Sequence, residues 1–220
     1  MRVTGQKVVH RSRGLLRELV SVRKLPLRVV ALYLRCLGVA LASRDRWSLH
    51  SATRPYELAK LLEVSRGRLR VAEIGTGTAW TTMALALADS GRRVVTYDPE
   101  VRPMRDRYLS LIDNGTRGRI DLIRDRGERG PEPGATIDML FIDGDHSREA
   151  TCAAFRAWEP ALDAGGVAAF HDYGPAYQGV IQAIDDLALD GAVFGNVFLW
   201  HKDPLGEETL APAGGPASAS

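Results

Sequence analysis

Short apolar runs alternate with amphipathic stretches through most of the chain. The runs that we expect to be strands are 69–74, 92–97, 119–123, 137–142 and 166–170, followed by an aromatic-rich segment at 193–200. The stretches with helical periodicity are 54–64, 79–90, 99–112, 147–162 and 176–189. Short buried strands that alternate with helices are typical of a parallel sheet covered on both faces. The pattern therefore predicts an α/β fold with a doubly wound, mostly parallel sheet.

An apolar region precedes this alternation. Residues 14–24 and 26–42 are expected to be two helices separated at Pro26, since proline fits the first turn of a helix but not its interior. The run from 27 to 42 is apolar except for Arg28 and Arg35. It is shorter than the about 20 residues that a membrane span needs. We expect no transmembrane segment, and a helix that caps the domain or joins two copies in a homodimer.

The composition is that of a soluble globular protein, with 45% hydrophobic and 25% charged residues among 220. We expect a basic helical extension at 1–50, the main domain at 51–202 and a disordered tail at 203–220, rich in Gly, Pro, Ala and Ser. Cys36 and Cys152 lie in apolar helical patterns without metal-type spacing, which indicates the reducing cytoplasm. No signal-peptide pattern opens the chain.

The net charge of +2 conceals an asymmetry. Residues 1–46 carry 11 Lys and Arg against two acidic residues, whereas the remainder carries 18 against 25. A basic arm on an acidic body suggests an anionic partner, a membrane surface or self-association; a solvated helix face is the plainer interpretation.

A glycine turn follows the first expected strand, and its sequence at 73–78 is Glu-Ile-Gly-Thr-Gly-Thr. Glycines at this position let a ligand approach the backbone at the start of the next helix. A dinucleotide site has a third small residue where this chain has Trp80, and an indole leaves little room for a pyrophosphate. Glu73 instead suits a cationic aminoacyl sulfonium ligand. Asp98, at the end of the second strand, can accept hydrogen bonds from ribose hydroxyls.

This turn resembles the first motif of class I S-adenosylmethionine methyltransferases. The resemblance implies that Glu73, Gly75, Thr76 and Gly77 bind the cofactor. It gives Asp98 the ribose contact and Asp125 an adenine contact, and it implies that Asp143 also belongs to the cofactor-binding residues. The plainer interpretation is that the glycines only make a tight turn and that Asp98 caps the next helix.

Two clusters of Asp and His follow the fourth and fifth strands. The fourth ends Asp-Gly-Asp-His-Ser at 143–147, and the fifth ends His-Asp-Tyr at 171–173. Ligands of open α/β sheets lie beyond the carboxyl ends of the strands, so the clusters should converge there. Asp143 and Asp172 could hold Mg²⁺ or Mn²⁺, which take carboxylate oxygens. A bound ion would lower the pKa of a substrate hydroxyl, and a nearby histidine could remove its proton.

These clusters are similar to those of the metal-dependent macrolide-sugar O-methyltransferases, over about residues 50–190. Catechol-type O-methyltransferases place a lysine base three residues after the first metal aspartate, where this chain has His146. The resemblance implies that His146 is the base, with His171 as the rival. The remaining metal ligand is His171 or Asp145. The plainer interpretations are that Asp145 caps a helix and that His171 is structural.

The resemblance implies an O-methyltransferase that acts on a sugar or oligosaccharide hydroxyl. Trp80, Tyr173 and Tyr177 are candidates to line the acceptor pocket. The basic arm, the high Arg and Ala content and the short polar tail resemble those of actinobacterial proteins. This general resemblance implies a mannoside in mycobacterial methylmannose polysaccharide synthesis as one acceptor. Glycosylated natural products and phenols are alternatives.

Three other classes of function remain as alternatives: an RNA methyltransferase, an NAD-dependent oxidoreductase and a non-catalytic partner protein. We expect no nucleic-acid partner, since the Asn/Asp-Pro-Pro-aromatic turn that usually goes with base methylation is absent.

Overall fold

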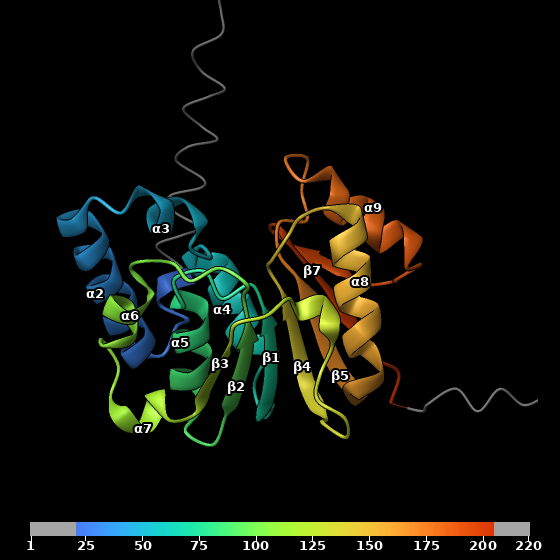
Figure 1. Ribbon diagram of the computed structural model, residues 1–220, viewed down its shortest axis with the longest axis horizontal. Helices are drawn as coiled ribbons and strands as arrows, with labels where there is room; N and C mark the ends of the chain where they lie inside the picture. Colours follow the sequence, from blue (N-terminus) through green and yellow to red (C-terminus); the bar gives the residue numbers. More distant parts are fainter. Residues whose placement is uncertain (1–20, 205–220) are drawn as a thin grey trace, which may run out of the picture.

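The computed structural model describes residues 21–204, which form a seven-stranded sheet with helices on both faces (Figure 1). The strand order is β3-β2-β1-β4-β5-β7-β6, and β1 to β5 are parallel. The strands are β1 (Arg70–Ile74), β2 (Arg93–Tyr97), β3 (Ile120–Ile123), β4 (Ile137–Ile142), β5 (Leu162–Phe170), β6 (Ala192–Phe194) and β7 (Val197–His201). The predicted doubly wound α/β fold is confirmed.

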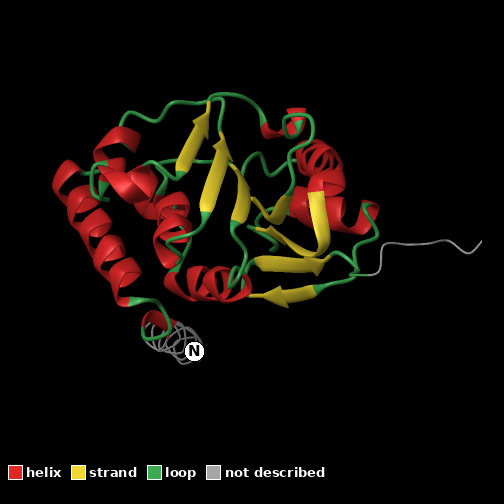
Figure 2. Cartoon of the chain, turned by 90° about the horizontal axis from the view of Figure 1, so that it is seen from below, coloured by secondary structure: helices red, strands yellow, loops and turns green. Residues whose placement is uncertain are grey.

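Helices cover the two faces of the sheet in separate layers (Figures 1 and 2). One layer contains α2 (Leu27–Ser43), α4 (Pro55–Val64) and α5 (Trp80–Ala88), and the other contains α8 (Arg148–Trp158) and α9 (Gln178–Asp186). Short helices α3 (Arg46–Ser51), α6 (Arg105–Leu109) and α7 (Asn114–Arg117) lie on the side of α2 and α5. Two 3-10 turns are at Gly127–Arg129 and Glu159–Ala161. Successive residues of β4 and β5 alternate between the two layers, as strand geometry requires.

Two segments differ most from the sequence prediction. The aromatic-rich stretch at 193–200 is two antiparallel strands, because Gly195, with φ of 65°, makes a tight turn between β6 and β7. The helix expected at 99–112 is limited to α6, with Pro99 and Pro103 in the irregular stretch before it. The helix at 26–42 is α2, whereas most of 14–24 and nearly all of the tail expected at 203–220 lie outside the described residues. Among residues 21–204, no helix combines the length and apolar character that crossing a bilayer requires.

Candidate active site

A cavity of about 800 Å³ lies beyond the carboxyl ends of β1, β2, β4 and β5. The sequence-predicted site residues that line it are Glu73, Gly75, Thr76, Gly77, Asp98, Asp143, Asp145, His146, His171 and Asp172. The parallel strands bring these residues together because all of the strands end at the same edge of the sheet. Asp125 is not among the lining residues; its neighbours Arg126, Gly127 and Glu128 line the cavity instead.

The glycine turn brings two strand ends into contact. Gly75 has φ of 102°, and a Cβ at this position would overlap the backbone carbonyl of Asp143. Gly77 has φ of 52° and lies under the indole of Trp47, which a Cβ would approach to 3.0 Å. Any larger residue at these two positions would therefore strain the backbone and collide with Asp143 or approach Trp47 too closely.

Glu73 is buried beneath this turn, with 1% of its surface exposed. Its Oε2 accepts hydrogen bonds from the hydroxyls of Thr82 and Thr96, the latter at 2.7 Å. Burial raises the pKa of Glu73 to about 8, although the two threonines oppose the shift. A nearby cation would favour its charged form.

Asp98 is already held by the protein. Its Oδ2 accepts hydrogen bonds from the backbone N–H of Gly77 at 2.9 Å and from Arg105 at 2.7 Å, and its Oδ1 accepts from the N–H of Glu100. Arg105 is buried and also donates to the carbonyl oxygen of Gly77. Asp98 therefore fixes the glycine turn, and Oδ1, with one protein partner, retains capacity for a ligand hydroxyl. It does not cap a helix, since α6 begins only at Arg105.

Asp125 and Trp80 have contacts that differ from the roles expected from the sequence. The carboxylate of Asp125 is paired with Arg129 on the surface. Trp80 packs edge-on between Tyr33 and Tyr108, with ring centroids 5.6 and 5.3 Å away. Its side chain is therefore mainly a core residue that borders the cavity.

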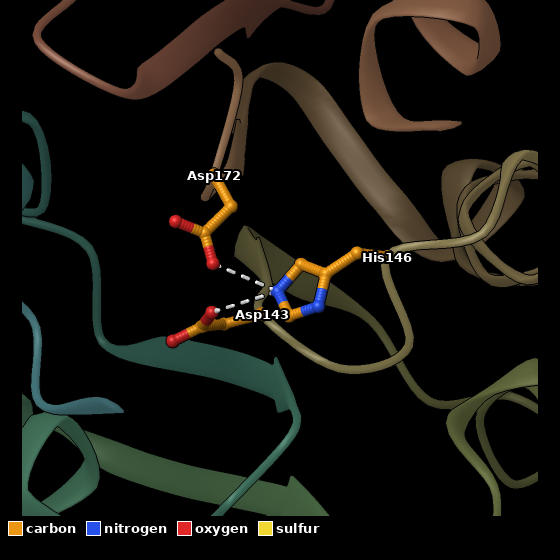
Figure 3. A group of neighbouring side chains, drawn as sticks. All are labelled: Asp143, His146 and Asp172. Carbon is orange, nitrogen blue, oxygen red and sulfur yellow. Dashed lines mark ion pairs between the residues drawn. The ribbon is translucent and has the colours of Figure 1, made fainter. Parts of the chain in front are cut away.

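Three side chains converge at the ends of β4 and β5 (Figure 3). Nε2 of His146 lies 2.9 Å from Oδ2 of Asp172 and 3.9 Å from Oδ1 of Asp143. This nitrogen is buried, and neither approach has hydrogen-bond geometry, so it has no hydrogen-bond partner. The ligand atoms of the three residues lie within 4.8 Å of one another. Asp172 has φ of 56°, and strain of this kind in a non-glycine residue is concentrated at functional sites.

Close contacts between the carboxylates and the imidazoles shift the pKa values in this cluster. Asp143 and Asp172, the carboxylates beside it, raise the pKa of His146 to about 9. Burial alone would raise the pKa of Asp172, but His146 and His171 hold it well below its usual value. A divalent cation between the carboxylates would replace the positive charge of the imidazolium.

His171 lies beside the cluster rather than within it. Its Nδ1 is 2.9 Å from Oδ1 of Asp143, and its Nε2 is 3.2 Å from Oε2 of Glu57. Burial lowers the pKa of His171, but the charge of Asp143 and the hydrogen bonds to its carboxylate neighbours raise it well above its usual value. Because both ring nitrogens face carboxylates, His171 is not placed as the metal ligand expected from the sequence. The structure groups His146 with the two aspartates instead.

Glu57, on α4, is the residue that the sequence analysis missed. It is buried, and the hydroxyl of Tyr56 and the backbone N–H of Arg54 donate to it as well. From the sequence, a glutamate two residues after Pro55 looks like an ordinary helix cap, and it does make that contact. Its pairing with His171, 114 residues away, has no local sequence signal.

Two neighbours position the His146 loop. The carboxylate of Asp145 accepts a hydrogen bond from the N–H of Ser147, whose own side chain caps α8. The rings of His146 and Tyr177 are in contact, with centroids 4.4 Å apart. Tyr177 is 40% exposed and lines the cavity, whereas Tyr173 packs against Phe198. Of the candidate acceptor-pocket residues, Tyr177 has the most suitable position.

The residues present fit both a divalent cation and S-adenosylmethionine. The ligand atoms of Asp143, His146 and Asp172 lie within 4.8 Å of one another. His171 is hydrogen-bonded to Asp143, and the ring of Tyr177 contacts that of His146. The glycine turn and Asp98 form the adjoining half of the same cavity.

This chain is similar to a known protein family and to solved structures of the same fold. A family model described as a methyltransferase domain matches residues 72–173. An O-methyltransferase from Bacillus cereus, solved with S-adenosylhomocysteine, superimposes with a TM-score of 0.59 at 20% identity, over 78% of this chain and 90% of that one. The solved structure shows the fold, and the family model indicates a methyltransferase domain over residues 72–173. No curated protein matches the chain in sequence.

Other proteins of this fold are named for different acceptors. The TDP-rhamnose 3′-O-methyltransferase CalS11 of calicheamicin biosynthesis has a TM-score of 0.52 at 16% identity, over 67% of this chain and 77% of that one. A putative rRNA methylase from Clostridium thermocellum has the same TM-score and identity, over 66% and 96%. The fold alone therefore does not identify the acceptor.

Proposed function

We propose that this protein is an S-adenosylmethionine-dependent, divalent-metal-assisted O-methyltransferase that acts on a sugar hydroxyl. The observation that carries the proposal is the convergence of Asp143, Asp172 and Nε2 of His146 next to the glycine turn. A methyl donor held at that turn and an acceptor held at the acidic cluster would share one cavity.

Each residue has a distinct task in this proposal. The turn around Gly75 and Gly77 and the carboxylate of Asp98 hold the nucleoside and the methionine portion of the donor. Asp143 and Asp172 hold Mg²⁺ or Mn²⁺, which when bound would lower the pKa of the acceptor hydroxyl. His146 accepts the hydroxyl proton, and the oxygen then attacks the sulfonium methyl group, releasing S-adenosylhomocysteine.

His171 keeps the cluster in place by holding Asp143 through Nδ1 while Glu57 holds Nε2. A hydrogen-bonded partner behind a metal ligand typically fixes its orientation. The pair replaces the direct metal-binding role expected for His171 from the sequence.

The acceptor site adjoins Tyr177, whose exposed ring suits the apolar face of a pyranose. CalS11 acts on a sugar and shares the fold, which supports the same acceptor class here. A mannoside of a polysaccharide is one member of this class; glycosylated natural products and phenols are the other acceptors to screen. The two buried free thiols are compatible with the cytoplasm as the site of the reaction.

Methyl transfer from labelled S-adenosylmethionine to a panel of glycans, natural-product glycosides, phenols and RNA tests the proposal. Transfer to a glycan that requires Mg²⁺ or Mn²⁺ and stops in excess chelator would support it. Full activity in excess chelator, or transfer only to RNA or a phenol, would overturn the metal or the sugar assignment. Thermal-shift titration with S-adenosylhomocysteine and with NAD distinguishes the methyltransferase from an oxidoreductase.

A further inference from the structure

An apolar stripe runs along the outward face of α2. Leu27, Leu34 and Leu41 are seven residues apart, and they are 88%, 61% and 66% exposed. Ala31 and Gly38, between them, are exposed as well. This spacing places all five residues on one side of the helix, which lies at an outer edge of the molecule in both views (Figures 1 and 2).

The two arginines of α2 border this stripe without covering it. Arg28 donates to the carbonyl oxygen of Ala88 at 3.0 Å, and Arg35 donates to that of Leu111 at 2.6 Å. Each follows a stripe leucine by one residue, and so lies about 100° around the helix from it. The arginines therefore lie along one border of an apolar strip that faces solvent.

Both ends of the stripe are positively charged. Arg23 and Lys24 precede α2, Arg44 and Arg46 follow its last turn, and all four are exposed. Asp45, the acidic residue among them, is engaged within the chain: it accepts hydrogen bonds from the backbone N–H of Ser48 and from the hydroxyl of Tyr108. Residues 1–20, which continue from this end, carry five more Lys and Arg against one acidic residue.

This combination selects among the possible occupants. In a second copy of the chain, parallel or antiparallel, α2 would bring like charges together at the helix ends. A nucleic acid would satisfy the cations but would leave the leucines in water. A bilayer interface with anionic headgroups offers phosphates to the cations and acyl chains to the leucines.

We propose that α2 binds the surface of an anionic membrane. The helix lies in the interfacial plane, with Leu27, Leu34 and Leu41 inserted below the headgroups and the flanking cations at headgroup level. The inference is independent of methyl transfer, since none of these residues lines the catalytic cavity.

Flotation of the full chain with phosphatidylcholine vesicles, with and without phosphatidylglycerol, tests the proposal. Wild type should bind only the anionic vesicles, and binding should weaken as salt is raised. Combined Leu34→Ser and Leu41→Ser should reduce binding by about tenfold or more. Arg44→Gln should reduce it about fivefold. Val193→Ser, an exposed apolar position on β6, is the matched control and should bind like wild type.

Three outcomes would overturn the proposal. One is no binding to anionic vesicles by a chain whose circular dichroism and melting temperature are normal. A second is binding that ignores the leucine substitutions and disappears only when residues 1–20 are deleted. The third is a soluble dimer that Leu34→Ser dissociates, since that would assign the stripe to a second copy.

Discussion

Nε2 of His171 lies 3.2 Å from Oε2 of Glu57, and both side chains are buried. The other ring nitrogen faces Asp143, so the imidazole connects α4 to the acidic cluster. Burial alone would raise the pKa of Glu57, but His171 and Tyr56 hold it below its usual value. His171, in turn, has its pKa raised by the carboxylates around it. The favoured state is therefore an ion pair.

Glu57→Gln should lower the stability of the metal-free protein by roughly 1–3 kcal/mol near pH 6. The pair is fully charged between the ordinary pKa values of 4.5 for glutamate and 6.5 for histidine. Its contribution is lost as pH falls through the lowered pKa of Glu57 and as pH rises through the raised pKa of His171. The difference in melting temperature between wild type and variant should therefore be largest near pH 6 and should narrow in alkali.

Tyr56→Phe is the matched control, because it removes a hydrogen bond to Glu57 without removing charge. Its melting-temperature deficit should vary less with pH. A constant deficit for Glu57→Gln from pH 5 to alkaline pH would show that no ion pair is present. Glu57→Gln should also weaken Mn²⁺ binding by about 10–100-fold, the usual effect of losing a group that supports a metal ligand.

The sequence predicted the elements of the site better than their partners. Asp143, His146 and Asp172 follow β4 and β5, and these strands are adjacent, so topology alone brings the residues together. In the structure, Val167 and Ala169 face the α4 layer, and strand alternation puts His171 on the same side. The residue that meets it there depends on how α4 packs, which no periodicity specifies.

Arg105 and Asp125 show the same limit at the cofactor half. Arg105 is the first residue of α6 and Asp125 lies in the loop after β3, and the resemblance to the methyltransferase motif favoured Asp125. In the structure Arg105 turns inward to Asp98, whereas Asp125 pairs with Arg129 on the surface. The direction of such side chains is decided by tertiary contacts, and the sequence pattern does not specify these contacts.

Asp98→Ala should weaken the binding of S-adenosylhomocysteine by about 1–3 kcal/mol, because it removes both a ribose contact and the hydrogen bond that fixes Gly77. Isothermal calorimetry gives the affinity directly. Asp125→Ala is the control, with an expected affinity near that of wild type. Equal losses in the two variants would return Asp125 to the adenine contact expected from the sequence.

Glu73→Gln should make the stability of the protein less dependent on pH. Burial raises the pKa of Glu73 from 4.5 to about 8, so folding takes up a proton between these values. Wild type should therefore lose stability as pH rises from about 5 through 8, and the neutral variant should lose less. Chemical denaturation of the ligand-free protein at several pH values measures this; identical slopes for both proteins would show that Glu73 is charged when folded. Thr82→Val, which removes one of its hydrogen bonds, is the comparison variant.

Asp143→Asn and Asp172→Asn should each weaken Mn²⁺ binding by about 100-fold or more, and turnover should fall with it. Affinity for S-adenosylhomocysteine should stay near that of wild type, because neither carboxylate is needed to hold the nucleoside. Asp145→Asn is the matched control: its carboxylate lies in the same loop, but it is engaged with Ser147. Electron paramagnetic resonance of Mn²⁺ reports binding without any turnover. Unchanged Mn²⁺ affinity in both aspartate variants would remove the metal from the mechanism.

His146→Ala should lower turnover by about 10²–10⁴, the usual effect of losing an acid–base group. In the metal-free protein the imidazole has its pKa raised to about 9 by Asp143 and Asp172, so its proton should come off only in alkali in a nuclear magnetic resonance titration. Mg²⁺ should lower that pKa, since the ion takes over the charge that the imidazolium supplies. The rate of the Mg²⁺-saturated enzyme should then rise with pH through an apparent pKa of about 6–7.

The role of His146 is decided by measuring Mn²⁺ affinity and the pH profile of the same variant. Nε2 cannot bind an ion and accept a proton at the same time, so the two uses give opposite results. If His146 is the base, His146→Ala should keep its Mn²⁺ affinity within a few-fold of wild type, and the rise of its rate with pH should disappear. If His146 is a metal ligand, His146→Ala should lose Mn²⁺ affinity by more than about tenfold. Its residual activity should still rise with pH. His50→Ala provides the control, because His50 lines the same cavity and its Nδ1 is bonded to the carbonyl of Arg46. It should change neither quantity.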